Sequence, residues 1–218
     1  MKNILLFGDS NTYGYKPDGS GRFDETVRWS AQVRDYFKEK GIHVIEEGLC
    51  GRTTVFEDEL RPYRRGADIL PVLLESHSPL DLVVIMLGTN DCKTRYQASP
   101  EVIAKGMELL AGQTEKIKGK KNPVVLLVSP IALGENIGTE GFDPEFDKHS
   151  IQVSKGLPGA YRKVAEKGGY EFLAASDYAS ASSVDCEHLD ERGHAYLAAA
   201  MIQKLEQILF STQEKHIA

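Results

Sequence analysis

The chain has 218 residues, of which 41% are hydrophobic and 27% charged, a composition typical of a globular protein with a sizeable core. A net charge of −6 argues against nucleic acids and anionic membranes as partners. No run approaches the roughly 18 apolar residues of a membrane span, and the apolar run at the N-terminus is too short for a secretory signal. The three cysteines form no Cys-x-x-Cys pair, so we expect no disulfide framework and a reducing, cytoplasmic location.

Short apolar runs separated by helix-length segments recur along the chain. The runs at 82–87 and 124–128 are continuous, which favours central strands of a parallel sheet that is covered on both faces. Strands alternating with helices predict right-handed βαβ units and a doubly wound α/β fold. The five runs that we expect to be strands are 3–7, 44–47, 82–87, 124–129 and 171–174.

Helices are expected between these strands and after the last one. Ser99 is a suitable N-cap for the third helix because it precedes Pro100 at the first helical position, and Asp190 suits the start of the last helix. Glycines within 156–159 should divide the fourth helix into two pieces. We see no repeat and no linker, so residues 1–218 should form a single domain. The expected helices are 27–40, 67–77, 100–118, 149–167 and 191–213.

Three polar segments fall outside these elements. The longest, 130–148, contains three glycines, and its length indicates a lid, a binding loop or a subunit contact. The basic cluster 61–65 should be a solvated loop or a subunit contact. The acidic run 57–59 should be a solvated surface rather than a metal site.

Ser10 directly follows the first predicted strand, in the sequence Gly8-Asp9-Ser10. Residues just beyond the carboxyl end of a strand are where α/β proteins bind their ligands, so the hydroxyl of Ser10 is well placed to act as a nucleophile. Asp-Ser after a strand is also ordinary turn and N-cap chemistry, because both side chains bond to nearby backbone N–H groups. The pair alone therefore does not identify a reactive serine.

Two further glycine-containing loops should lie beside Ser10 if the strand order is 2-1-3-4-5. One follows the second strand and holds Gly51, and the other follows the third strand and holds Asn90. Acyl transfer by a serine needs N–H donors for the oxyanion, and the backbone N–H groups of Ser10 and Gly51 with the Asn90 amide would supply them. Alternatively, Gly51 serves only a left-handed turn and Asn90 only caps a turn.

His188 is the best of the six histidines for the general base. It lies in the loop before the last helix, and Asp185, three residues earlier, can accept from one ring nitrogen and leave the other free. Asp-x-x-His is common on its own, so the spacing supports the assignment without proving it. His194 falls in the last helix, where packing or capping explains it more simply.

Other chemistries have weaker support in the sequence. There is no Gly-x-Ser-x-Gly, no Walker motif, no Gly-x-Gly-x-x-Gly and no His-Glu-x-x-His. Cys50, Cys92 and Cys186 lie in the predicted site loops, but they lack the paired close spacing of a zinc site. We expect them to be small fillers, and we expect no metal.

The four segments together resemble the SGNH, or GDSL-type, hydrolases. Gly8-Asp9-Ser10, Gly51, the run Gly88-Thr89-Asn90-Asp91 and Asp185-x-x-His188 occur in the order and spacing of that family. Further stretches resemble a bacterial branch that contains aryl esterases, acyltransferases and carbohydrate acetylesterases. These stretches are 27–29, 46–49, 52–54, 80–91 and 128–130.

The resemblance implies a flavodoxin-like three-layer α/β sandwich with a five-stranded parallel sheet, and ester hydrolysis without metal or cofactor. It implies that Ser10 is the nucleophile, His188 the base and Asp185 its orienting partner, with Ser10, Gly51 and Asn90 as oxyanion donors. It also implies a homo-oligomer in which 61–66 and 130–148 narrow the pocket. Asn11 departs from the leucine of the motif, and Tyr13 and Tyr15 stand where the aryl esterase branch tends to carry tryptophan. The residues expected to contact the substrate are Asp9, Asn11, Tyr13 and Tyr15.

We therefore predict a serine esterase that cleaves small esters, of acetyl or other short-chain acyl groups, through an acyl-enzyme. The alcohol would be an aryl, alkyl or sugar alcohol, and we expect neither nucleic acid nor membrane as a partner. Three alternatives remain open at this point. They are a thioesterase or lysophospholipase with the same triad, an acyltransferase that passes the acyl group to an alcohol, and a non-catalytic carbohydrate-binding protein.

Overall fold

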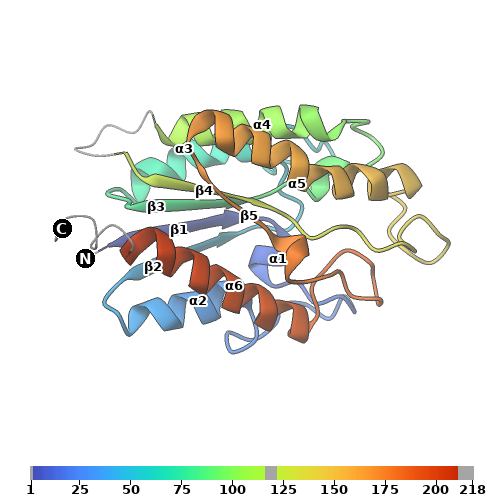
Figure 1. Cartoon of the computed structure of the whole chain (residues 1–218). Coiled ribbons are helices and arrows are strands. Elements are labelled where there is room, and N and C mark those ends of the chain that lie inside the picture. The colour runs from blue at the N-terminus through green and yellow to red at the C-terminus, as the bar shows by residue number, and fades with distance from the viewer. Residues whose placement is uncertain (1, 116–121, 211–218) are drawn as a thin grey trace.

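The fold is known from a computed structural model, which describes residues 2–115 and 122–210. A central sheet lies between two helical layers, with helices α2 and α6 on one face and α3, α4 and α5 on the other (Figure 1). All neighbouring strands are parallel and follow the order β2-β1-β3-β4-β5. The strands are β1 Asn3–Gly8, β2 His43–Gly48, β3 Leu82–Met86, β4 Val124–Ser129 and β5 Glu171–Ala174.

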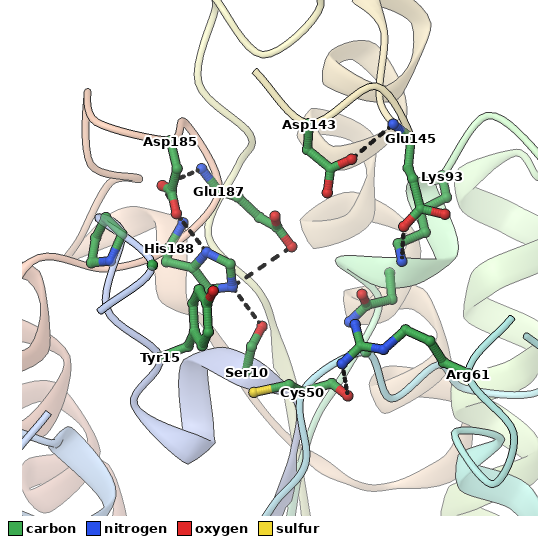
Figure 2. Close-up of a pocket in the computed structure, with 14 residues that line it drawn as sticks. Ser10, Tyr15, Cys50, Arg61, Lys93, Asp143, Glu145, Asp185, Glu187 and His188 are labelled. Carbon is green, nitrogen blue, oxygen red and sulfur yellow. Dashed lines mark hydrogen bonds and ion pairs between the residues drawn. The ribbon is translucent and has the colours of Figure 1, made fainter. Parts of the chain in front are cut away.

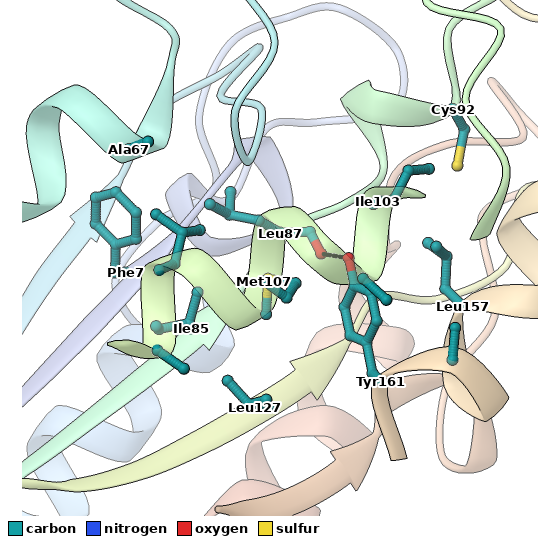
Figure 3. Packing of buried hydrophobic residues seen from close by; sticks show 14 of the residues in the cluster. Phe7, Ala67, Ile85, Leu87, Cys92, Ile103, Met107, Leu127, Leu157 and Tyr161 are labelled. Carbon is teal, nitrogen blue, oxygen red and sulfur yellow. Dashed lines mark hydrogen bonds between the residues drawn. The ribbon is translucent and has the colours of Figure 1, made fainter. Parts of the chain in front are cut away.

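These bounds confirm the five predicted strands and the doubly wound α/β class. The reason lies in the side chains of the central strands, which are buried on both faces. Phe7 and Ile85 pack with the layer of α3, α4 and α5, whereas Leu6 and Val84 pack with α2 and α6. Figure 3 shows the first of these clusters. A strand that is covered on both faces needs a continuous apolar run, which is the pattern in the sequence.

The helices also follow the prediction, with differences at their ends. Ser99 caps α4 by accepting from the backbone N–H of Val102, as expected for a serine before Pro100. The predicted ends of the third and last helices, at 118 and 213, fall outside the described residues. Within residues 2–115 and 122–210 no helix combines the length and apolarity needed to cross a bilayer. The long helices are α2 Trp29–Lys38, α3 Gly66–Ser76, α4 Pro100–Thr114, α5 Lys148–Gly168 and α6 Glu191–Phe210.

The prediction of two pieces for the fourth helix was wrong, because α5 is a single helix of 21 residues that contains Pro158. A capping box between Asp147 and Ser150 starts it, and Gly169 ends it in the left-handed conformation. Gly156 has a packing role, since a Cβ atom there would lie 2.6 Å from Cγ of Pro100. Burial of one face of α5 thus outweighs the roughly 3 kcal/mol that an interior proline costs a helix.

Candidate active site

The carboxyl ends of β1, β2 and β3 meet at one rim of the sheet, where a pocket of about 290 Å³ opens. The lining of this pocket includes residues from the loops after each of these strands, such as Ser10, Gly51 and Asn90. Asp185 and His188 reach it from the loop before α6. The strand order that was assumed from the sequence therefore brings the five predicted reactive groups to one cavity (Figure 2).

Ser10 is presented by a short helix that the sequence analysis did not anticipate, α1 at Ser10–Tyr13. Asp9 is its N-cap, and Oδ1 of Asp9 accepts from the backbone N–H of Asn11 at 3.0 Å. Gly8 has to be glycine because a Cβ atom there would lie 2.0 Å from Oγ1 of Thr12. The chain therefore turns sharply out of β1 and leaves the hydroxyl of Ser10 at the pocket floor.

Ser10, His188 and Asp185 form a continuous hydrogen-bonded series. Nε2 of His188 lies 2.8 Å from Oγ of Ser10, and Nδ1 lies 2.6 Å from Oδ2 of Asp185. The other oxygen of Asp185 accepts from the backbone N–H groups of Glu187 and His188, both at 3.0 Å. Because an ionised carboxylate only accepts, the bond to Asp185 places a proton on Nδ1 and leaves Nε2 free to accept from Ser10.

The surroundings of His188 set its pKa by opposing effects. Burial acts to lower the pKa, whereas the hydrogen bond to Asp185 and the negative charges of Glu187 and Asp185 act to raise it. The charges prevail, so the pKa of His188 lies above its ordinary value of 6.5. An imidazole in this state can take a proton from a hydroxyl and return it to a leaving group near neutral pH.

N–H donors lie on the side of the pocket formed by the loops after β2 and β3. Gly51 has a φ of +83°, and a Cβ atom there would lie 2.8 Å from Nη1 of Arg61. The amide nitrogen of Asn90 donates to the carbonyl of Arg52 at 3.1 Å, which fixes the side chain and leaves its second hydrogen available. Both residues line the pocket with Ser10, an arrangement that can hold an oxyanion.

Only one of the four expected substrate contacts lines the pocket. This is Tyr15, whose ring centroid lies 4.8 Å from that of His188. Asp9 is fully buried as the helix cap, and burial raises its pKa to about 6. Asn11 is also buried and bonds to the loop that carries His188, accepting from the N–H of Leu189 at 2.9 Å. Tyr13 packs instead against Arg22 outside the pocket, with the guanidinium carbon of Arg22 4.3 Å from the centroid of the Tyr13 ring.

Charged residues complete the pocket, and several of them lie in the two segments, 61–66 and 130–148, that were expected to narrow it. Segment 130–148 supplies Asp143 and Glu145, and the carboxylate of Glu145 accepts from Nζ of buried Lys93 at 2.6 Å. Arg61 from the basic cluster also lines it, as does Glu187 within the Asp-x-x-His motif. The sequence provided little indication that these particular side chains line the pocket, because the role of a charged loop residue depends on which strand ends lie beside it.

The acidic run 57–59 differs from the expected solvated surface at its middle residue. Asp58 is 1% exposed and accepts from Nη1 of Arg95 at 2.8 Å, so it holds the loop beside the pocket rather than facing water. His194 is buried in α6, where Nδ1 accepts from the backbone N–H of Trp29 at 3.3 Å. Its burial lowers its pKa to about 4, which agrees with the packing role expected for it.

The three cysteines are free thiols in or near the pocket loops, with Cys92 and Cys186 buried and Cys50 partly exposed. No group of three or more histidine, cysteine or acidic side chains in the described part of the chain could hold a metal ion.

A parallel α/β sheet with a serine, a histidine and an aspartate hydrogen-bonded in series at its rim is the arrangement of a serine hydrolase. The chain belongs to the GDSL-like lipase/acylhydrolase family, whose sequence model matches residues 6–196. This confirms the family resemblance that the motifs indicated, and with it a carboxylic ester hydrolase. None of the curated proteins compared with the chain matches it.

Solved structures of esterases superpose on nearly the whole chain. The M. smegmatis aryl esterase is 34% identical with a TM-score of 0.88, and the match covers 96% of this chain and 100% of that chain. Est24, a carbohydrate acetylesterase from Sinorhizobium meliloti, is 35% identical with a TM-score of 0.88 and the same coverage. A carbohydrate acetylesterase family member from the same organism is 32% identical with a TM-score of 0.89, covering 96% and 99%.

Proposed function

We propose that this ester hydrolase acts on short-chain, acetyl-type esters of aryl, alkyl or sugar alcohols through a covalent acyl-enzyme on Ser10. The observation that carries the proposal is the unbroken series of hydrogen bonds from Ser10 to His188 at 2.8 Å and from His188 to Asp185 at 2.6 Å. A serine hydroxyl is a weak nucleophile until a neighbouring base removes its proton, and this geometry supplies the base.

In the acylation step, Nε2 of His188 takes the proton of Ser10 while Oγ attacks the ester carbonyl. The negative charge that develops on the carbonyl oxygen is held by the backbone N–H groups of Ser10 and Gly51 and by the amide of Asn90. The imidazolium of His188, stabilised by the carboxylate of Asp185, then protonates the leaving alcohol as the tetrahedral intermediate collapses.

In the deacylation step, water takes the place of the alcohol beside His188. Nε2 removes a proton from this water, and the resulting hydroxide attacks the acyl carbonyl on Ser10. Collapse of the second intermediate returns the proton to Oγ of Ser10 and releases the carboxylic acid. The same oxyanion donors serve both steps.

The size and lining of the pocket support small substrates. Its volume of about 290 Å³ is at the lower end of the range for small-molecule sites, and its lining includes several charged side chains. Such a lining is unfavourable for a long acyl chain, which needs an extended apolar surface. The structural relatives named as an aryl esterase and as a carbohydrate acetylesterase favour the same class of substrate.

Replacing Ser10 with alanine tests the nucleophile directly. We expect Ser10→Ala to lower kcat on p-nitrophenyl acetate by about 10³-fold or more, because only the oxyanion donors and binding contacts remain. Ser76→Ala, at the exposed end of α3, serves as the matched control and should keep the rate of the unaltered protein.

The same assay tests the preferred chain length. Acetyl and butyryl esters should be cleaved faster than the octanoyl ester of the same phenol. Near-full activity of Ser10→Ala would overturn the mechanism, and a clear preference for the octanoyl ester would overturn the substrate class while leaving the mechanism intact.

A further inference from the structure

Glu187 is a buried carboxyl group without a hydrogen-bond partner beside the reactive histidine. It is 8% exposed, and Oε1 lies 3.8 Å from Nε2 of His188, which is too long for a hydrogen bond. Among the described residues no N–H or O–H group donates to its carboxyl. Figure 2 shows the side chain directed into the pocket rather than into the protein.

A buried carboxylate in this position is costly when it is charged, because His188 is its only ion-pair partner among the described residues and carries a charge only when protonated. Burial raises the pKa of Glu187 to about 7, and the negative charges of Asp143 and Asp185 add to this effect against the opposing influence of His188 and Lys93. A cation placed against the carboxylate would compensate this cost. A cationic group of a substrate would therefore bind favourably beside Glu187.

Asp143 lines the same pocket and forms no ion pair among the described residues. One of its oxygens accepts from the backbone N–H of Glu145 at 2.8 Å, and its side chain points toward the cavity (Figure 2). Lys93, the nearby buried cation, is already engaged by Glu145 at 2.6 Å and Asp58 at 3.9 Å. Arg61, the other cation that lines the pocket, donates to the carbonyl of Cys50 at 3.2 Å. Among the described residues neither cation forms an ion pair with Glu187 or Asp143, so these two carboxylates remain open to a ligand.

Glu187 lies on the side of the site where the alcohol half of the ester would bind. The carbonyl oxygen has to face Gly51 and Asn90, while the leaving oxygen has to meet Nε2 of His188 to receive its proton. Because Glu187 lies beside Nε2, it borders the space that the alcohol half of the substrate would occupy.

We infer that Glu187 and Asp143 form an acidic subsite that selects esters whose leaving alcohol carries a positive charge, such as those of short amino alcohols. The inference rests on the proposed function, because it uses His188 to locate the leaving group. It narrows the alcohol from any aryl, alkyl or sugar alcohol to one with an ammonium group close to the ester oxygen.

Acetylcholine and 3,3-dimethylbutyl acetate test this selection, because they share size, shape and acyl group and differ only in the charge. We expect kcat/KM to favour acetylcholine by about tenfold above pH 7, where Glu187 is ionised. The preference should weaken as the pH falls below 7, since protonation removes the charge of Glu187.

Substitutions that keep shape and remove charge identify the side chains responsible. Glu187→Gln should bring the ratio of the two kcat/KM values close to one, and Asp143→Asn should reduce it by a smaller factor. Glu140→Gln, which removes one negative charge from an exposed position of the same loop as Asp143, should leave the ratio unchanged.

An equal rate on the two esters, or a preference that Glu187→Gln does not alter, would overturn the acidic subsite. That outcome is distinct from failure of the proposed function. In the first case both esters are still hydrolysed and Ser10→Ala abolishes the hydrolysis, whereas in the second case hydrolysis survives the loss of Ser10.

Discussion

At the scale of single residues, the site depends on how the loop carrying His188 is held against α1. Asn11 does this with both ends of its amide, accepting from the N–H of Leu189 at 2.9 Å and donating to the carbonyl of Glu187 at 3.4 Å. Asn11, which stands where the family motif has leucine, thus anchors the loop that carries His188. A leucine would fill the space without making either bond.

The sequence could predict site residues that belong to motifs with a characteristic spacing. The proximity of Ser10, Asp185 and His188 could be predicted because their segments together match the order and spacing of a known family, although neither short pattern is specific alone. Glu187 and Lys93 could not, because their meaning depends on charges that approach from distant loops. The prediction that Asp58 is solvated was wrong for the same reason. An acidic run does not indicate that its middle residue will be buried in an ion pair with a distant arginine.

The pKa of His188 predicts how the rate depends on pH. The base must be neutral to accept the proton of Ser10, so kcat/KM on p-nitrophenyl acetate should fall as the pH drops through the His188 pKa. Because that pKa is raised, the midpoint of the acidic limb should lie above 6.5. Glu187→Gln removes one of the charges that raise it and should move the midpoint to lower pH.

A pH-rate profile from mildly acidic to mildly alkaline conditions measures this midpoint for each variant. Glu140→Gln provides the control for a general change in net charge and should leave the midpoint where it was. A midpoint at or below 6.5 in the unaltered protein would show that burial, rather than the neighbouring carboxylates, controls His188.

At the scale of elements, α5 fixes the exit of β3. The hydroxyl of Tyr161 on α5 donates to the carbonyl of Leu87 at 2.9 Å (Figure 3). The next residue, Gly88, has a φ of +127°, and a Cβ atom there would lie 2.4 Å from the same hydroxyl. The helix therefore sets the course of the chain toward Asn90, three residues beyond Leu87.

Sequence patterns could predict the strands but only part of α5. A buried strand shows itself as an apolar run, whereas the continuity of α5 through Gly156 and Pro158 comes from packing against α4, which local preferences do not contain. The sequence placed segment 130–148 at the pocket by its length and by the family resemblance. It did not indicate that Asp143 and Glu145 are the side chains of this segment that line the cavity, because the segment has no periodic pattern.

Removing the hydroxyl of Tyr161 should destabilise the protein. Tyr161→Phe keeps the ring in the core but leaves the buried carbonyl of Leu87 without its donor, so we expect the free energy of unfolding to fall by about 1–3 kcal/mol. Urea denaturation measures the change. Tyr178→Phe alters an exposed hydroxyl and should change the value by less than about 0.5 kcal/mol. Equal stability of both variants would show that the bond to Leu87 contributes nothing.

At the scale of the whole molecule, the strand order brings distant parts of the chain to one rim. Ser10 and His188 are separated by 178 positions in the sequence and by 2.8 Å in the fold. The alternation of strands and helices predicted a doubly wound sheet, whereas its order, 2-1-3-4-5, was assumed and agreed with the family resemblance. The observed order explains why the reactive loops converge. The charge of the pocket could not be expected, because it comes from side chains on four separate loops.

The central claim is that Ser10 becomes covalently acylated, and mass spectrometry after reaction with a fluorophosphonate probe tests it most directly. The probe phosphonylates an activated serine and stays attached, so digestion locates the modified residue. We predict a single adduct on the peptide that contains Ser10, and no adduct in Ser10→Ala. An adduct on another residue, or an unmodified protein that still cleaves p-nitrophenyl acetate in the presence of the probe, would contradict the account.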